Sequence, residues 1–157
     1  MSYQHSDGEV SAIYRPRAEP ELGGPSPMSF VAPGRLTRRQ FGLFRRDMAP
    51  HAGGPRAHFH RTYSESFYIL AGTVRVYDGN EWREAAAGDF LYVPKGGIHA
   101  FSADSDEPSS MLILFAPGAA RERYFIELDE IRTSGRKLSP RQWTELWARH
   151  DQYMVRG

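Results

Sequence analysis

Short runs of strand-forming residues alternate with turn signals at roughly ten-residue spacing from residue 28 to residue 117. Proline and glycine mark most of these turns, because they supply the restricted or positive φ angles that reverse a chain. The turn signals are Pro33-Gly34, Asp78-Gly79-Asn80, Gly88-Asp89, Pro94-Lys95-Gly96-Gly97 and Pro117-Gly118. Regularly spaced short strands of this kind are typical of a sandwich or a barrel, so we predict an all-β fold.

The strands are predicted from runs rich in β-branched and aromatic residues and from the alternation of apolar with polar positions. We expect them at Met28–Ala32, Gln40–Met48, Ser66–Tyr77 with a break at Gly72, from Trp82 onward, Phe90–Val93, Ile98–Phe101 and Met111–Phe115. The pair Asp78-Gly79 predicts a tight hairpin before Trp82, since glycine tolerates the positive φ that such a turn requires.

The C-terminal part changes from strand to helix patterning. A helix is predicted over Ala119–Ile131 by a stripe of apolar residues at helical spacing, namely Tyr124, Phe125, Leu128 and Ile131. Ser139 and Pro140 suit the N-cap and the first position of a second helix. The apolar face of this second helix consists of Trp143, Leu146 and Trp147. We expect both helices to pack on the outside of the barrel or across a dimer interface.

The composition excludes several classes of protein and site. A chain of 157 residues fits one domain with a substantial core. The formal net charge is +1, whereas proteins that bind nucleic acid are usually more basic, so we expect no nucleic-acid partner. The sequence has no cysteine, which excludes disulfides, zinc–thiolate sites and cysteine nucleophiles. Any metal must therefore be held by nitrogen and oxygen.

Residues 1–27 are rich in Pro, Gly, Glu and Ser, and we interpret them as an irregular arm that lies against the body or a neighbouring subunit. Met1–Val10 is polar and acidic, unlike the basic and apolar regions of a signal peptide. No apolar run approaches the ~20 residues that cross a bilayer. We therefore expect a cytoplasmic protein without a membrane partner.

One stretch, Gly53 to Gly72, combines side chains that bind metals. His58 and His60 are two residues apart, so on a strand both imidazoles point to the same face. Glu65 begins the next strand-forming run. Two imidazoles and a carboxylate that converge on an interior are a ligand set for a divalent transition metal.

A second stretch, Gly88 to Phe101, places His99 shortly after a Pro/Gly turn. Together the two stretches resemble the two motifs of the cupin superfamily. The first motif is H-x-H-x4-E-x6-G over residues 58–72, and the second is G-x5-P-x-G-x2-H over residues 88–99. Two positions depart from the family pattern. Ala103 stands where an asparagine often follows the second histidine, and the glycine that opens the first motif is offset by one residue, at Gly53. Neither position supplies a metal ligand.

The resemblance implies a small single-domain cupin, a double-stranded β-helix (a jelly-roll-like barrel) with one metal in its mouth. It assigns residues 28–116 to the barrel and 117–157 to a helical tail packed on the barrel. The ligands would be His58, His60, Glu65 and His99, which leave a divalent ion at formal charge +1 with open coordination positions. Fe, Mn, Ni, Cu and Zn all suit such ligands.

The substrate pocket is predicted from alternation along the strands. Phe67 and Ile69 share a strand face with Glu65, and Phe101 shares one with His99, so these three would form a wall beside the metal. Packing in the core is an equally good explanation for each of them. Such a wall suits an aromatic or otherwise apolar small molecule. Arg56 and Arg75 could orient an anionic group, although a surface position is the more ordinary one.

The layout resembles quercetin 2,3-dioxygenase-like small cupins, which implies an oxidoreductase acting on an aromatic or enol-type metabolite, with Glu65 as the catalytic base. The same ligands also suit a non-redox isomerase or cyclase. A barrel that binds metal or ligand without turnover is the third alternative. A homodimer is expected, since the arm and outward-facing apolar residues such as Tyr68 and Leu70 need cover.

Overall fold

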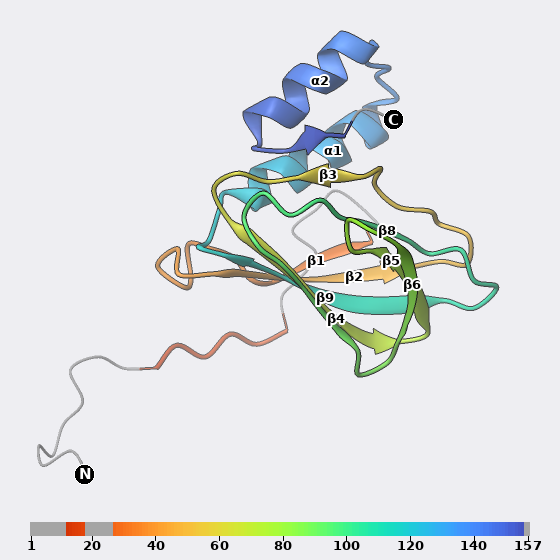
Figure 1. Cartoon of the computed structure of the whole chain (residues 1–157). Helices are drawn as coiled ribbons and strands as arrows, with labels where there is room; N and C mark the ends of the chain where they lie inside the picture. The colour runs from red at the N-terminus through yellow and green to blue at the C-terminus, as the bar shows by residue number, and fades with distance from the viewer. Residues whose placement is uncertain (1–11, 18–26, 156–157) are drawn as a thin grey trace, which may run out of the picture.

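The computed structural model describes residues 12–17 and 27–155, and its strands wrap into a barrel (Figure 1). A five-stranded sheet has the order β1-β2-β9-β4-β7, with β1 Met28–Ala32, β2 Gly42–Met48, β9 Ser109–Ala116, β4 Ser64–Ala71 and β7 Phe90–Val93. A three-stranded sheet has the order β6-β5-β8, with β6 Trp82–Ala86, β5 Thr73–Tyr77 and β8 Ala100–Ser102. A two-stranded sheet joins β10 Tyr153–Met154 to β3 His58–Phe59. The predicted all-β fold, a double-stranded β-helix followed by helices, is confirmed.

The core lies between the sheets and follows the alternation of the strands. Phe44 of β2 pairs with Ile113 of β9, which pairs in turn with Phe67 of β4. All three side chains are buried, and together they form one row across the inner face of the five-stranded sheet. On β2 the same inward face continues through Arg46 to Met48, so a guanidinium stands among buried apolar residues.

The hairpin predicted at Asp78-Gly79 joins β5 to β6. Gly79 has a φ of 97°, in the region that favours glycine. The Asp78 carboxylate accepts hydrogen bonds from the backbone N–H groups of Asn80 at 2.9 Å and Glu81 at 3.0 Å. These two bonds close the turn and set the register of the hairpin.

The two helices lie over the end of the barrel where β3 runs, as Figure 1 shows. Helix α1 spans Arg121–Ser134 and ends at Gly135, whose φ is 68°. Helix α2 spans Pro140–Arg149, and its N-terminus carries a capping box in which Ser139 and Gln142 bond reciprocally. Leu146, the buried residue of α2, fixes this helix on the body. The helices therefore lie over one end of the barrel.

The described helices are too short and too polar to cross a membrane. The predicted N-terminal arm falls largely outside the described residues. Tyr68 is exposed and Leu70 is partly buried on the outer face of β4, as their alternation predicts. The homodimer and the domain boundaries stay predictions.

Candidate metal centre

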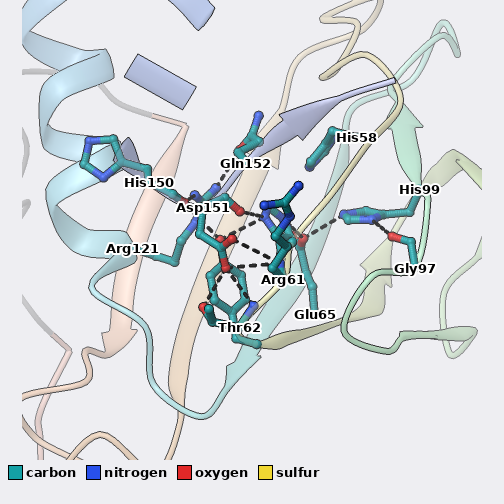
Figure 2. A network of polar contacts seen from close by, with 12 residues as sticks. His58, Arg61, Thr62, Glu65, Gly97, His99, Arg121, His150, Asp151 and Gln152 are labelled. Atoms are coloured by element: carbon teal, nitrogen blue, oxygen red, sulfur yellow. Dashed lines mark hydrogen bonds and ion pairs between the residues drawn. The ribbon is translucent and has the colours of Figure 1, made fainter. Parts of the chain in front are cut away.

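Four side chains predicted as metal ligands converge at the helical end of the barrel. His58 lies on β3, His60 follows it, Glu65 is on β4 and His99 immediately precedes β8. One ligand atom from each residue lies within 4.8 Å of the others. All four residues are buried, with at most 5% of their surface exposed. Figure 2 shows His99 and Glu65 directed toward each other inside this group.

The backbone around the histidines is fixed by a short ladder. His58 N–H donates to the His99 carbonyl at 3.0 Å and His99 N–H donates back at 2.9 Å, so the two motifs are joined directly. Gly96, with a φ of 79°, donates its N–H to the His60 carbonyl at 2.6 Å. The glycine-rich turn of the second motif therefore places His99 opposite the histidine strand.

Each imidazole is oriented by a backbone carbonyl at its Nδ1 atom. The acceptors are Arg56 O at 2.7 Å for His58, Asp151 O at 2.7 Å for His60 and Gly97 O at 3.0 Å for His99. With Nδ1 protonated and donating, each Nε2 atom carries a free lone pair. This tautomer is the one that metal-binding histidines adopt, because the carbonyl holds the ring and leaves Nε2 for the ion.

The donor set fits a divalent cation on chemical grounds. Glu65 Oε2 lies 2.9 Å from His60 Nε2 and 2.8 Å from His99 Nε2. In the tautomer that the carbonyls impose, these contacts bring nitrogen lone pairs against a carboxylate oxygen. Such an arrangement is repulsive unless protons or a metal ion lie between the atoms. A divalent ion held by all four residues would remove this repulsion.

Burial sets the protonation of the cluster. It lowers the pKa of His58 to about 3, so this imidazole is neutral and ready to bind a cation. Burial alone would raise the pKa of Glu65. When protons rather than a metal ion lie between Glu65 and the Nε2 atoms of His60 and His99, the resulting hydrogen bonds outweigh burial and hold the pKa well below its usual range. For His99, burial acts downward and the bond with Glu65 acts upward, and the net pKa is raised. Glu65 is therefore a carboxylate.

The sequence reasoning missed Asp151, which ties the C-terminal segment to the metal ligands. Its carboxylate accepts hydrogen bonds from Arg61 N–H at 3.1 Å, Thr62 N–H at 2.8 Å and the Thr62 hydroxyl at 2.6 Å (Figure 2). Its carbonyl accepts from His60 Nδ1, which is 91 residues away in the sequence. Beside it, β10 pairs with β3, with Met154 opposite His58. No local sequence pattern predicts a contact between residues so far apart in the chain.

A cavity of about 350 Å³ opens beside the cluster, and its wall includes His58 and Glu65. A volume of this size is within the range of small-molecule sites. Most of the wall is apolar, and the helices contribute Tyr124, Phe125, Leu128, Trp143 and Trp147 to it. The expectation that the helices only cover the barrel from outside is therefore incomplete, since they line the cavity.

Of the three predicted pocket residues, Phe101 lines this cavity, whereas Phe67 and Ile69 do not. The ring of Phe67 packs 5.7 Å from that of Phe101 and 5.9 Å from that of His99, measured between centroids. Successive inward positions on a strand lie about 7 Å apart, so each step along β4 from Glu65 leads away from the helical end. Phe67 and Ile69 therefore support the site from the core.

The two arginines considered as anion partners have different positions. Arg56 lines the cavity, and its carbonyl orients His58. Arg75 is on the surface, where it forms an ion pair with Asp104 at 3.1 Å.

The comparisons with known proteins agree with this fold. Residues 44–115 match the sequence profile of the cupin domain. Quercetin 2,3-dioxygenase of Bacillus subtilis (strain 168) is 31% identical over 61 residues, which are 39% of this chain and 18% of that protein. The chain spans less than half of the length of the curated relatives that it matches.

Solved structures resemble the whole barrel. A protein with a double-stranded β-helix domain from Klebsiella pneumoniae superposes with a TM-score of 0.53 at 21% identity, covering 71% of this chain and 94% of that chain. The polyketide cyclase RemF from Streptomyces resistomycificus gives a TM-score of 0.54 at 16% identity, covering 69% and 80%. At these identities the likeness establishes the fold. The chain therefore has the double-stranded β-helix fold, and its residues 44–115 match the cupin domain in sequence.

Proposed function

We propose that this chain is a metal-dependent enzyme with dioxygenase-like activity on a small aromatic or enol-type molecule. One observation carries the proposal: the ligand atoms of His58, His60, Glu65 and His99 lie within 4.8 Å of one another, and the cavity reaches them. A buried cluster of this composition would be costly without a cation. An apolar cavity beside it suits an apolar substrate.

A divalent transition metal held there would supply Lewis-acid chemistry and, if redox-active, oxygen chemistry. The chain's own residues have separable roles. Glu65 is the only carboxylate among the described residues that line the cavity, so we assign to it the removal of a proton from an enol or phenol hydroxyl. Phe101, Phe125 and Trp147 exclude water and hold the ring of the substrate.

The similarity to quercetin 2,3-dioxygenase supports the oxidative form of this proposal. The cupin match includes Glu65 and His99 together with the core strands that position them. The similarity covers a small part of that enzyme, so the support concerns the type of site and leaves the substrate open.

Metal content is the first test. Protein purified without chelator from metal-supplemented cells should carry about one equivalent of Fe, Mn, Ni, Cu or Zn by elemental analysis. His60→Ala and His99→Ala should each lose most of this metal, because each removes one of four ligands. His51→Ala is the matched control, since His51 pairs with Asp106 on the surface. Wild-type metal content in both ligand variants would refute the assignment of the site.

Dioxygen uptake is the second test. The protein reconstituted separately with each of the five metals should consume dioxygen with at least one member of a panel of flavonols and β-dicarbonyl compounds. His99→Ala should abolish the uptake, and His51→Ala should preserve it. Stable metal binding without uptake under any of these conditions would reject the dioxygenase proposal. It would favour a non-redox isomerase or cyclase, or a binding protein.

A further inference from the structure

The charged residues of the cavity wall are mostly positive. Arg46, Arg56 and Arg121 line it, against the single carboxylate of Glu65. Glu65 already faces two imidazoles, so its charge is committed to the proposed metal centre. The remaining wall therefore presents uncompensated guanidinium groups to whatever enters the cavity.

Arg46 has an unusual environment for an arginine. It occupies an inward position of β2 between Phe44 and Met48, and its guanidinium carbon lies 5.4 Å from the centroid of the Phe101 ring. Its Nε atom is buried without a hydrogen-bond partner. Among the described residues, no carboxylate forms an ion pair with it. Burial lowers the pKa of Arg46, which expresses the same cost of holding this charge away from water.

Arg121 supplies a second charge in the same wall, and only 4% of its surface is exposed. It donates to the His150 carbonyl at 3.2 Å and to Gln152 Oε1 at 3.0 Å, and its guanidinium carbon lies 4.0 Å from the centroid of the Tyr124 ring. Its Nε atom is also buried without a partner. All of these contacts are with neutral groups, so they fix the guanidinium without neutralising it.

Several arginines elsewhere in the described chain form ion pairs with carboxylates. Arg45, the neighbour of Arg46 on the opposite face of β2, forms an ion pair with Asp47 at 3.0 Å. Arg75 pairs with Asp104, and Arg83 with Asp78. Arg46 and Arg121 instead face the cavity, and a buried unpaired charge is expensive. An anion that enters the cavity offsets this cost and gains charge-assisted hydrogen bonds.

We propose that the substrate is an aromatic or enol-type carboxylate, whose carboxylate pairs with Arg46 in the field of Arg121 while its hydroxyl oxygens face the histidine cluster. The placement of the hydroxyl oxygens at the histidine cluster rests on the proposed function. Arginine suits the role because its planar fork matches the two oxygens of a carboxylate. Arg46 is then the residue that selects for a charged substrate. Arg121 adds to the attraction for the anion while it keeps its hydrogen bonds with His150 and Gln152.

Matched ligands test the proposal. The probes are 3,4-dihydroxybenzoate, 3,4-dihydroxyphenylacetate and 3-(3,4-dihydroxyphenyl)propanoate, each against its own neutral carboxamide. The catechol end of each probe can face the cluster, and the three chain lengths sample the separation from Arg46. Isothermal titration of the metal-loaded protein should show at least one carboxylate binding about 10- to 100-fold more tightly than its amide.

Arg46→Gln should bring this ratio close to one while leaving the Kd of the amide and the metal content unchanged. Arg46→Lys should retain part of the preference. Arg45→Gln, one residue away on the outer face, should retain all of it. A purely structural role for Arg46 would change both ligands equally, so the ratio separates the two roles. Equal binding of acid and amide by the wild-type protein at every chain length would overturn the inference while the metal centre stands.

A second pair of probes distinguishes failure of the inference from failure of the proposed function. Phenylacetate and phenylacetamide have no catechol group, so in metal-free protein their difference in affinity depends on the arginines. Wild-type protein that holds no metal but prefers phenylacetate, with the preference lost in Arg46→Gln, would support the anion site and reject the metal enzyme. Metal-free protein that binds the two equally would reject the anion site as well.

Discussion

Asp151 offers the sharpest test of how the C-terminal segment supports the candidate metal ligands. Its carboxylate accepts three hydrogen bonds, from Arg61 N–H, Thr62 N–H and the Thr62 hydroxyl. Arg61 and Thr62 are exposed, so water can replace part of each bond, and a net value of about 0.5–1 kcal/mol per bond applies. Loss of the carboxylate should therefore lower the free energy of unfolding by about 2 kcal/mol.

The choice of substitution isolates this effect. Asp151 has a φ of 53°, which aspartate tolerates better than alanine does. Asp151→Gly removes the carboxylate without adding strain at this φ, and Asp151→Asn retains one acceptor oxygen. Asp151→Ala should be the least stable variant, because it adds about 1 kcal/mol of backbone strain. Urea unfolding should give the order of stability wild type, Asn, Gly, Ala.

The metal should respond as well, because the Asp151 carbonyl orients His60. If the segment shifts when its carboxylate is lost, the Nδ1 bond of His60 loosens and metal affinity should fall by about 10- to 100-fold. Competition with a chromophoric chelator measures this fall. A Gly variant that unfolds at the wild-type urea concentration and retains wild-type metal affinity would refute the coupling.

Two further predictions concern the backbone and pH. Gly54→Ala should destabilise the protein by more than about 3 kcal/mol in urea unfolding, because the added Cβ would lie 1.9 Å from the Phe101 carbonyl oxygen. Gly53→Ala should cost only about 1 kcal/mol, because its Cβ would meet open space and only the φ of 68° is unfavourable for alanine. Similar losses for both would show that the contact with Phe101 is relieved easily. The pKa of Asp78 is lowered to about 2 by hydrogen bonds from the backbone N–H of Glu81, the side chain of Arg83 and the backbone N–H of Asn80. The Asp78 carboxylate therefore stabilises the hairpin fully above the ordinary pKa of 3.8, and this contribution is lost as the pH falls toward 2. An NMR titration of the Asn80 amide should show the low midpoint, and a midpoint near 3.8 would contradict it.

Local rules predicted the barrel well because each strand carries its own signal. Met28–Ala32 and Phe90–Val93 have the predicted bounds, since turn residues flank both. Around His99 the prediction was less accurate: regular pairing in β8 begins only at Ala100, and His99 itself forms an isolated bridge to His58. Pairing across the site, which no window of sequence contains, determines where that strand begins.

The site was predictable where strand alternation and motif spacing determine it. It was not predictable where the packing of the helices against the barrel determines it. Alternation assigns Phe67 to the same face as Glu65, but it does not give the depth at which the cavity ends. Helical periodicity finds the apolar face of α2 and does not say that Trp147 lines a cavity. Arg46 has a signal in the sequence, because alternation places this arginine on the same strand face as Phe44 and Met48.

The pairing of β3 with β10 has a consequence for the order of events during synthesis. A nascent chain presents its three histidines and Glu65 long before residues 151–155 leave the ribosome. Until then His60 lacks the carbonyl that aligns it, and β3 lacks the strand on its other side. In the proposed metal centre, an ion captured at that stage would meet a loose set of donors and would exchange readily. The ion that is kept would then be chosen after translation of both helices, from the metal pool that the folded protein meets.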